Sequence, residues 1–216
     1  MSFGTLIAQL GSGMLTSIEI FVLTLLGSLP LGLFIALGRM SRNFILRNLM
    51  RIYISVLRGT PLMLQVMVMF WGPYYIFGIS IGSEYRFKAA IIAFVLNYAA
   101  YFAEIYRAGI EAVAKGQYEA ASVLGYSRAQ TFLRVVLPQM VRHVIPPVTN
   151  EMITLIKDTS LAFAIAVTEM FTVAKSLASA QTSMVPYLAA AIFYYLFNLI
   201  VAAGMERAEK KLAYYR

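Results

Sequence analysis

The amino-acid sequence predicts an all-α integral membrane protein with five transmembrane helices. Of its 216 residues, 60% are hydrophobic and 13% are charged, a balance that exposes more apolar surface than a soluble domain would cover. The apolar residues form blocks of about 20, the length that a helix needs to cross roughly 30 Å of hydrocarbon. Transmembrane β-strands would give a weaker, alternating pattern. We interpret residues 1–216 as a single transmembrane domain.

Each predicted span follows from one of these apolar blocks. The spans cover approximately residues 14–37, 59–81, 88–107, 138–156 and 183–205. Pro30 interrupts the first span, which is tolerable where other helices cover the freed carbonyl. The second contains no charge and ends in aromatic residues suited to a membrane interface. The third contains Glu104 near its inner end, and the fifth lies within the uncharged stretch 176–205.

The fourth span, which begins at Pro138, is the least apolar of the five because two charges and two further prolines lie within it. These residues are Arg142, Pro146, Pro147 and Glu151. We therefore expect protein to bury this helix on several sides. The following stretch, 158–175, is too short and too polar at its ends for a crossing, so we predict a half-helix at the outer side.

The distribution of positive charge sets the predicted orientation. Fourteen of the 18 Lys and Arg residues fall in three segments, 39–58, 107–142 and 206–216. Since cytoplasmic loops carry an excess of Lys and Arg, we place these segments inside, the N-terminus outside and the C-terminus in the cytoplasm. The net charge of +8 then reports topology rather than nucleic-acid binding. Cysteine is absent and His143 is the single histidine, which excludes disulfides and leaves little for zinc.

The cytoplasmic segment 116–139, GQYEAASVLGYSRAQTFLRVVLPQ, predicts two short helices joined at a glycine. Gly125 suits the left-handed position that follows a first helix over 117–124. Ser127 and Gln130 have the spacing of a capping box, so a second helix is expected to begin there. Periodicity alone leaves open an interfacial helix that only anchors the fold.

The same segment carries a family motif, in which Glu-Ala-Ala precedes a glycine and, further on, an aliphatic residue and Leu-Pro. The matching residues are Glu119, Ala120, Ala121, Gly125, Val135, Leu137 and Pro138. This spacing resembles the cytoplasmic EAA loop of permease subunits of binding-protein-dependent ABC importers. Three more stretches are similar to the polar amino-acid uptake family, which serves histidine, arginine, glutamine and related cargo. They are LRGTPLMLQ (57–65), YFAEIYRAGIEAVAKGQYEAA (101–121) and LIKDTSLAFAIAVTEM (155–170).

The resemblance implies a type I ABC importer permease core that pairs with a second permease subunit, as a homodimer in preference to a heterodimer. The EAA helix would dock on one of two ABC ATPase subunits, which bind ATP and Mg²⁺. An extracytoplasmic solute-binding protein would deliver the amino acid, and the complex would lie in the bacterial cytoplasmic (inner) membrane. The residues expected to couple to the ATPase are Gly116, Tyr118, Glu119, Ala120, Ala121 and Gly125.

The chain contains no G-x-x-x-x-G-K-[ST] phosphate loop. We therefore expect that it is not an enzyme by itself, and that it holds no cofactor of its own.

Polar residues recur at helical spacing on the third and fourth spans, and on each span they share one face. Because an ionisable residue inside a span is a functional candidate, we expect the two faces to form a polar chamber on the substrate path. The residues predicted to bind substrate are Asn97, Tyr98, Tyr101, Glu104, Glu151, Thr154, Leu155 and Asp158.

The chemistry of these faces leaves the cargo open. Carboxylates hold either a cationic side chain or the α-ammonium group of any amino acid. Three acids favour a basic amino acid such as arginine, lysine or histidine, and glutamine or another polar amino acid is the alternative. A structural role is also open, in which Arg107 and Lys157 neutralise nearby acids and Asn97 bridges two helices.

Two further interpretations complete the prediction. Glu19 and Glu169 are expected at the membrane interface. An ion-coupled secondary amino-acid transporter would also use buried acids, but it would not need an EAA helix and it commonly shows inverted repeats, which we do not find.

Overall fold

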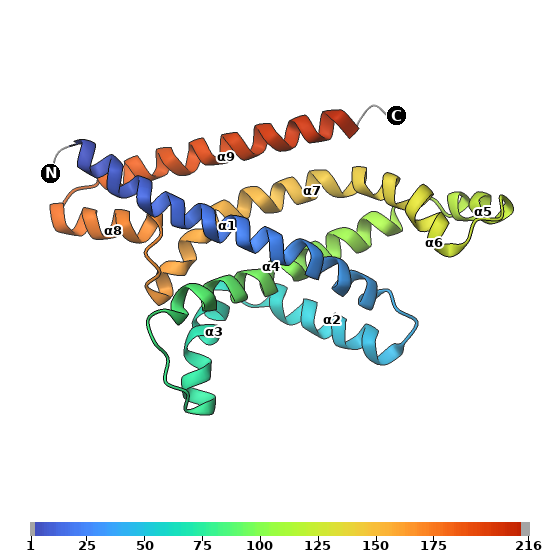
Figure 1. The fold of residues 1–216 in the computed structure, drawn as a ribbon, viewed down its shortest axis with the longest axis horizontal. Coiled ribbons are helices and arrows are strands. Elements are labelled where there is room, and N and C mark those ends of the chain that lie inside the picture. Colours follow the sequence, from blue (N-terminus) through green and yellow to red (C-terminus); the bar gives the residue numbers. More distant parts are fainter. Residues whose placement is uncertain (1–2, 213–216) are drawn as a thin grey trace.

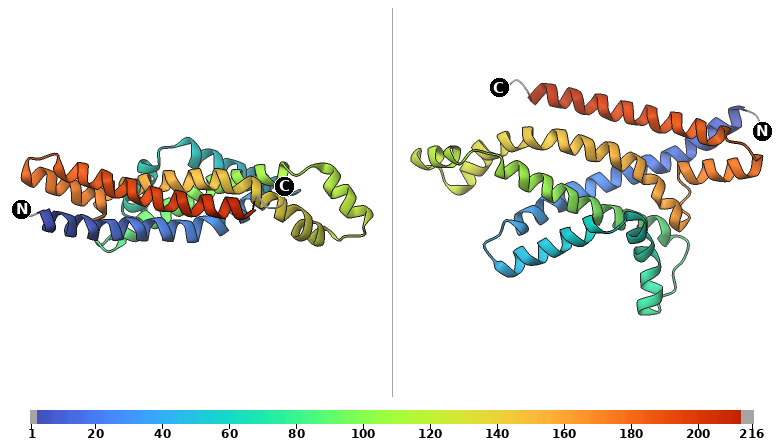
Figure 2. Two further views of the ribbon diagram at one scale, coloured as in Figure 1. Left: turned by 90° about the horizontal axis from the view of Figure 1, so that it is seen from above. Right: turned by 180° about the vertical axis from the view of Figure 1, so that it is seen from behind.

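The computed structural model of the chain describes residues 3–212, and the regular elements in this part are all helical. They are α1 (Phe3–Arg39), α2 (Phe44–Gly59), α3 (Leu62–Phe77), α4 (Tyr85–Glu111), α5 (Lys115–Val123), α6 (Arg128–Thr131), a π-helical turn (Phe132–Val136), α7 (Leu137–Asp158), a 3₁₀-helix (Thr159–Ile165), α8 (Met170–Gln181) and α9 (Val185–Leu212). Residues 1–2 and 213–216, the last of which end the predicted cytoplasmic tail, lie outside the described part. The long helices lie in one flattened layer, and α3 runs at a steep angle to their direction (Figure 1, Figure 2).

The contact between α1 and α4 lies at the centre of this layer. Ala99 and Ala103 of α4 are buried beside Ala36 of α1. On α1, a Cβ added to Gly32 would lie 2.8 Å from the Phe102 Cβ and 3.1 Å from the Ala99 carbonyl oxygen. Since lipid gives helices no hydrophobic reason to associate, close approach of backbones at small residues supplies much of the stabilisation.

The second span differs from the prediction, because it is a bent pair of helices. The predicted span 59–81 corresponds to α3, and most of the preceding segment, predicted as an inner loop, forms α2. The two helices meet at 108° across Thr60 and Pro61. Pro61 has no N–H to donate and drives Thr60 into the extended conformation observed there, so the helix ends at Gly59.

Side-chain amides cover the polar groups that this break exposes. The Gln65 Nε2 donates to the carbonyl oxygens of Leu57 (2.9 Å) and Thr60 (3.1 Å). From α4, the Asn97 Nδ2 donates to the same Leu57 oxygen at 2.9 Å and to the Gln65 Oε1 at 3.0 Å. A non-helical backbone at membrane depth is tolerated where protein satisfies it in this way.

The fourth span is also irregular at both ends. Next to Pro138, the chain forms a π-helical turn in which the Leu137 N–H donates to the Phe132 carbonyl, so the predicted bend takes the form of a register shift. At the other end, the predicted half-helix over 158–175 becomes the 3₁₀-helix and the first part of α8, and α8 is bent by 60° from the path Arg128–Ile165. Ala166 turns the chain there with a φ of 57°.

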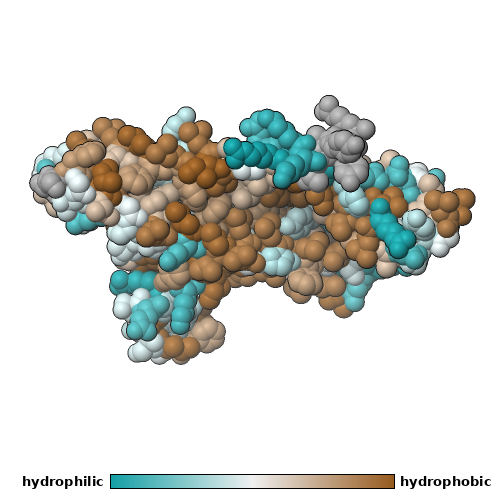
Figure 3. Space-filling model, turned by 45° about the horizontal axis from the view of Figure 1, so that its top comes forward, coloured by the Kyte–Doolittle hydropathy of each residue, from teal (hydrophilic) through white to brown (hydrophobic). Residues whose placement is uncertain are grey.

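The surface of the molecule is largely apolar, as Figure 3 shows on one face. In the described part, α1, α4 and α9 are each long and apolar enough to cross a membrane, and counting each bent pair as one span raises the number to as many as five. Large exposed side chains on α1, α3 and α9 include Phe34, Tyr75 and Ile200. In a membrane such faces meet lipid or another subunit.

Replacing Gly32 by alanine should lower the melting temperature of the detergent-solubilised protein. The added methyl group overpacks the α1–α4 contact, where the Ala99 backbone restricts relaxation, and such strain typically costs about 1–3 kcal/mol. Gly11→Ala on the same helix is the matched control, because no heavy atom lies within 4 Å of its added Cβ. Equal melting temperatures for the two variants would contradict this account of the packing.

Candidate functional site

A groove of about 510 Å³ lies between α4 and α7, with the end of α2 on its rim. Its polar and charged lining residues are Arg58, Tyr101, Glu104, Arg107, His143 and Glu151. The two faces predicted from helical spacing therefore meet, since Tyr101 and Glu104 come from α4 and Glu151 comes from α7. The groove combines an aromatic wall with charges of both signs.

Further along α7, Tyr98 and Asp158 join the same two helices. The Tyr98 hydroxyl donates to the Asp158 Oδ2 at 2.7 Å, and the Tyr98 ring is 2% exposed. The rings of Tyr98 and Tyr101 lie 6.1 Å apart between centroids. The residues described include no ion pair between Lys157 and Asp158. The partner of Asp158 is the Tyr98 phenol, where the structural alternative expected Lys157.

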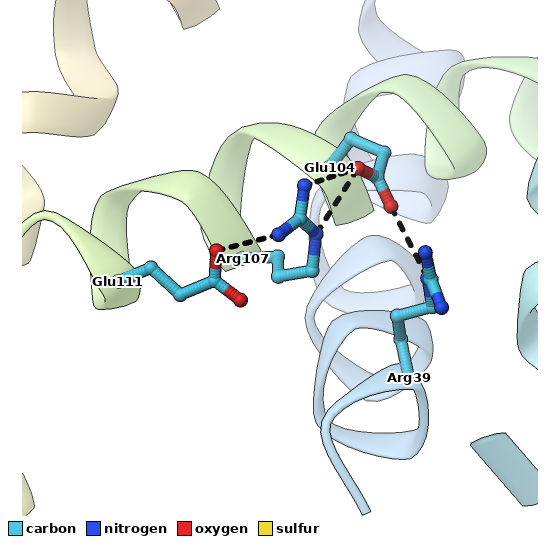
Figure 4. A network of polar contacts seen from close by, with 4 residues as sticks. All are labelled: Arg39, Glu104, Arg107 and Glu111. Atoms are coloured by element: carbon cyan, nitrogen blue, oxygen red, sulfur yellow. Dashed lines mark hydrogen bonds and ion pairs between the residues drawn. The ribbon is translucent and has the colours of Figure 1, made fainter.

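Glu104 is held in a network of ion pairs (Figure 4). Its Oε2 accepts from the Arg107 Nη2 at 2.7 Å and Nε at 3.1 Å, and its Oε1 lies 3.5 Å from the Arg39 Nε. Arg107 also reaches the Glu111 Oε2 at 2.6 Å. Glu104 thus has the Arg107 partner that the structural alternative expected, and Arg39 as a second one.

Five of the predicted residues do not line the groove: the Tyr98–Asp158 pair, and three residues with other roles. Asn97 is 4% exposed, and its amide is used at the α2–α3 break. Leu155 is fully buried in the main apolar core, and the exposed Thr154 donates its hydroxyl to the Asn150 carbonyl one turn earlier. The sequence spacing found the correct face, but it did not distinguish these roles.

Sequence reasoning missed Arg58, which it counted among the charges of an inner loop. The residue lies in the last turn of α2, and its guanidinium Cζ is 5.0 Å from the centre of the Tyr101 ring. The signal in the sequence is the Gly-Thr-Pro that follows Arg58 directly, since Pro61 ends a helix and leaves the arginine at its tip.

Glu169, predicted at the membrane interface, is enclosed by protein. Its side chain is fully buried and caps the N-terminus of α8, accepting from the N–H groups of Phe171 (2.7 Å) and Thr172 (2.8 Å). The Tyr194 hydroxyl of α9 donates to it at 3.1 Å. Burial of this carboxylate is therefore offset by fixed donors, and it ties α8 to α9. Glu19 is exposed.

The segment 116–139 has the predicted turn chemistry. Gly125 has a φ of 74°, and Ser127 and Gln130 form a capping box with both hydrogen bonds present. This segment projects at one end of the molecule (Figure 1).

The residues predicted to contact an ATPase lie on or beside α5. Gly116, Tyr118, Glu119, Ala120 and Gly125 are exposed, and Ala121 is buried with a 2% exposed side chain.

A sequence profile of the family described as "Binding-protein-dependent transport system inner membrane component" matches residues 28–214. The chain belongs to this family. The permease is 38% identical over 208 residues to the L-cystine transport system permease protein TcyB of Bacillus subtilis (strain 168), covering 95% of this chain and 87% of that protein. It is 33% identical over 202 residues to the putative glutamine transport system permease protein GlnP of Rickettsia conorii (strain ATCC VR-613 / Malish 7), covering 93% and 91% respectively.

A chain from the crystal structure of an amino acid ABC transporter with histidines superposes on the permease with a TM-score of 0.87. It is 30% identical and covers 98% of this chain and 99% of its own. The predicted family and the all-α fold of a type I importer permease are thus confirmed. Since its relatives are permease proteins, the chain is a transport component and not a hydrolysing subunit.

Asn97→Ala should destabilise the permease, because it withdraws two part-buried hydrogen bonds from the α2–α3 break and leaves the Gln65 Oε1 without this donor. Leaving buried polar groups unpaired typically costs about 1–3 kcal/mol, so the melting temperature in detergent should fall. Asn198→Ala is the control, since that amide donates to the Tyr194 carbonyl within the same helix. An unchanged melting temperature combined with lost substrate binding would identify Asn97 as a ligand-binding residue instead.

Proposed function

We propose that two copies of the permease form the translocation pathway of an ATP-driven importer of polar amino acids in the bacterial cytoplasmic membrane. The observation that carries this proposal is the α4–α7 groove, with Tyr101 and Glu151 on its walls. Relatives named for cystine and glutamine transport support amino acids as the class of cargo. An extracytoplasmic binding protein delivers the amino acid, and two partner ATPase subunits bind ATP and Mg²⁺.

In this proposal the Glu151 carboxylate binds the α-ammonium group of the cargo. Glu104 is neutralised by Arg107 and Arg39, so Glu151 is the acid of the groove that remains for a cation. The neighbouring ring of Tyr101 supplies an apolar wall for the carbon chain. Charge-assisted hydrogen bonds of this kind are about twice as strong as neutral ones, which makes Glu151 the main polar contact.

The side chain of the cargo is assigned through Asp158. A basic amino acid such as arginine, lysine or histidine would place its cationic group near this carboxylate, which Tyr98 already orients. Glutamine or another neutral polar amino acid is the second candidate, and the neutralisation of Glu104 favours it because fewer negative charges face the groove.

The coupling role belongs to the segment around α5. Val123 and Leu124 at its tip are 88% and 72% exposed, and apolar side chains exposed together mark a surface that another protein covers. The left-handed Gly125 then joins this docking surface to the helical path that leads into α7. Closure of the ATPase subunits would move α5 and, through this path, the wall that carries Glu151.

Glu151→Gln and Asp158→Asn test the substrate assignment in proteoliposomes that contain the permease, its ATPase and its binding protein. Loss of the Glu151 charge should reduce uptake of both arginine and glutamine about tenfold or more, because every α-amino acid has the ammonium group. Asp158→Asn should reduce arginine uptake selectively if the cargo is basic. The control is Glu209→Gln on the exposed face of α9. Wild-type uptake by both variants would remove the groove from the path.

Gly125→Val tests coupling to ATP hydrolysis. A β-branched residue disfavours the left-handed backbone at this position, so the joint between the two short helices should be distorted. Uptake per ATP hydrolysed should fall severalfold while the protein remains folded. Gly204→Val on α9 is the control, because its Cβ would meet no atom within 4 Å. Undiminished ATP-driven uptake by Gly125→Val would argue against the coupling role.

A further inference from the structure

We propose that Arg58 binds the α-carboxylate of the transported amino acid and, together with Glu151, recognises its zwitterionic head. This inference rests on the proposed function, because it takes the α4–α7 groove as part of the amino-acid path. It adds a residue that sequence analysis had placed in a loop.

The position of Arg58 within the fold is unusual for a charge that only sets orientation. It is in the last turn of the 16-residue α2, which at 1.5 Å per residue places it about 20 Å from the loop where that helix begins. The inner end of α2 already has Arg42 and Arg47. Arg58 lies instead at the far end of this helix, in the groove that Arg107 also lines, and an ionisable residue within a spanning segment is a functional candidate by default.

Two of the charged residues that line the groove do not take part in an ion pair within the described part of the chain. Glu104 is paired with Arg107 and Arg39, and His143 lies toward the α5 end on the exposed side of α7. Arg58 and Glu151 remain, and in residues 3–212 no ion pair within 4.0 Å includes either of them. Both residues line the same groove, Arg58 from α2 and Glu151 from α7. A ligand with one negative and one positive group complements this pair.

Tyr101 holds the guanidinium in a position where it can act on a carboxylate. The Arg58 Cζ lies 5.0 Å from the centre of the Tyr101 ring, within the range of a cation–π contact. An arginine that rests on an aromatic face keeps the N–H groups at its planar edge available for bidentate binding of a carboxylate. Tyr101 is therefore a positioning residue for Arg58 as well as a wall of the groove.

This arrangement separates what all amino acids share from what distinguishes them. Arg58 and Glu151 bind the carboxylate and ammonium groups that every α-amino acid has. The side chain then extends toward other residues of the path, and cargo selection occurs there. If Arg58 had only a structural role, in which its charge stabilises the C-terminal end of the α2 dipole, replacing it would change the affinity for every ligand equally or not at all.

The test measures equilibrium binding to the detergent-solubilised permease–ATPase complex without the binding protein, so that the binding protein's own selectivity does not contribute. The probes are L-arginine and L-glutamine, each paired with the decarboxylated analogue, which for arginine is agmatine. The wild type should bind each amino acid about tenfold more tightly than its analogue. Arg58→Ala should abolish this preference without weakening the analogue, and Arg58→Lys should restore part of it.

Arg51→Ala, an exposed arginine of the same helix, is the matched control and should bind like the wild type. Equal losses for amino acid and analogue in Arg58→Ala, or no loss, would overturn the role of Arg58. If Glu151→Gln also loses binding in that case, the proposed path stands without this inference. If the wild type binds neither amino acid, the groove is not a substrate site and both proposals fail.

Discussion

A backbone carbonyl at membrane depth has no water to bind, so each break in a spanning helix needs a donor from the protein itself. The carbonyl of Leu57 meets this constraint with two donors, Gln65 from its own span and Asn97 from α4. Because these amides satisfy the break, α2 can stop beside α4 and α3 can leave with a bend of 108°. The stop in turn fixes the tip of α2 beside Tyr101, and the shape of the groove depends on it.

The second break, between the 3₁₀-helix and α8, is satisfied by the Glu169 carboxylate. Glu169 caps α8 from a fully buried position and accepts from backbone and side-chain donors of two helices. Ser17 of α1 supports the same turn by accepting from the Met170 N–H at 3.2 Å. Both breaks therefore link helices that are distant in the sequence.

The sequence was informative where the physical cause is local. The left-handed Gly125 and the Ser127–Gln130 capping box follow from neighbouring residues, and the structure confirms both. The helical spacing of polar residues likewise identified the facing sides of α4 and α7. The bent second span was not predicted in this way. The arginines before Gly59 are equally compatible with a cytoplasmic loop and with a helix, and the uncharged run after Gly59 does not decide between them.

The roles of single site residues depended on partners that are distant in the chain. Glu104 lies on the predicted face, but Arg39 reaches it from the end of α1, and no periodicity within α4 reports that contact. Asn97 shares the spacing of a ligand-binding residue, yet the α2–α3 break uses its amide. Glu169 follows an apolar stretch, and its position in the sequence does not reveal that it caps α8.

The ion-pair network around Glu104 has a consequence for the residence time of the cargo. A conduit must hold its passenger weakly enough to let it leave, since a deep energy well along the route would slow turnover. Two arginines already occupy Glu104 on the wall of the groove, so a cation that moves past it meets a compensated charge. Arg107 is also paired with Glu111, so on the proposed path an amino acid that leaves Glu151 would meet acids that already have partners.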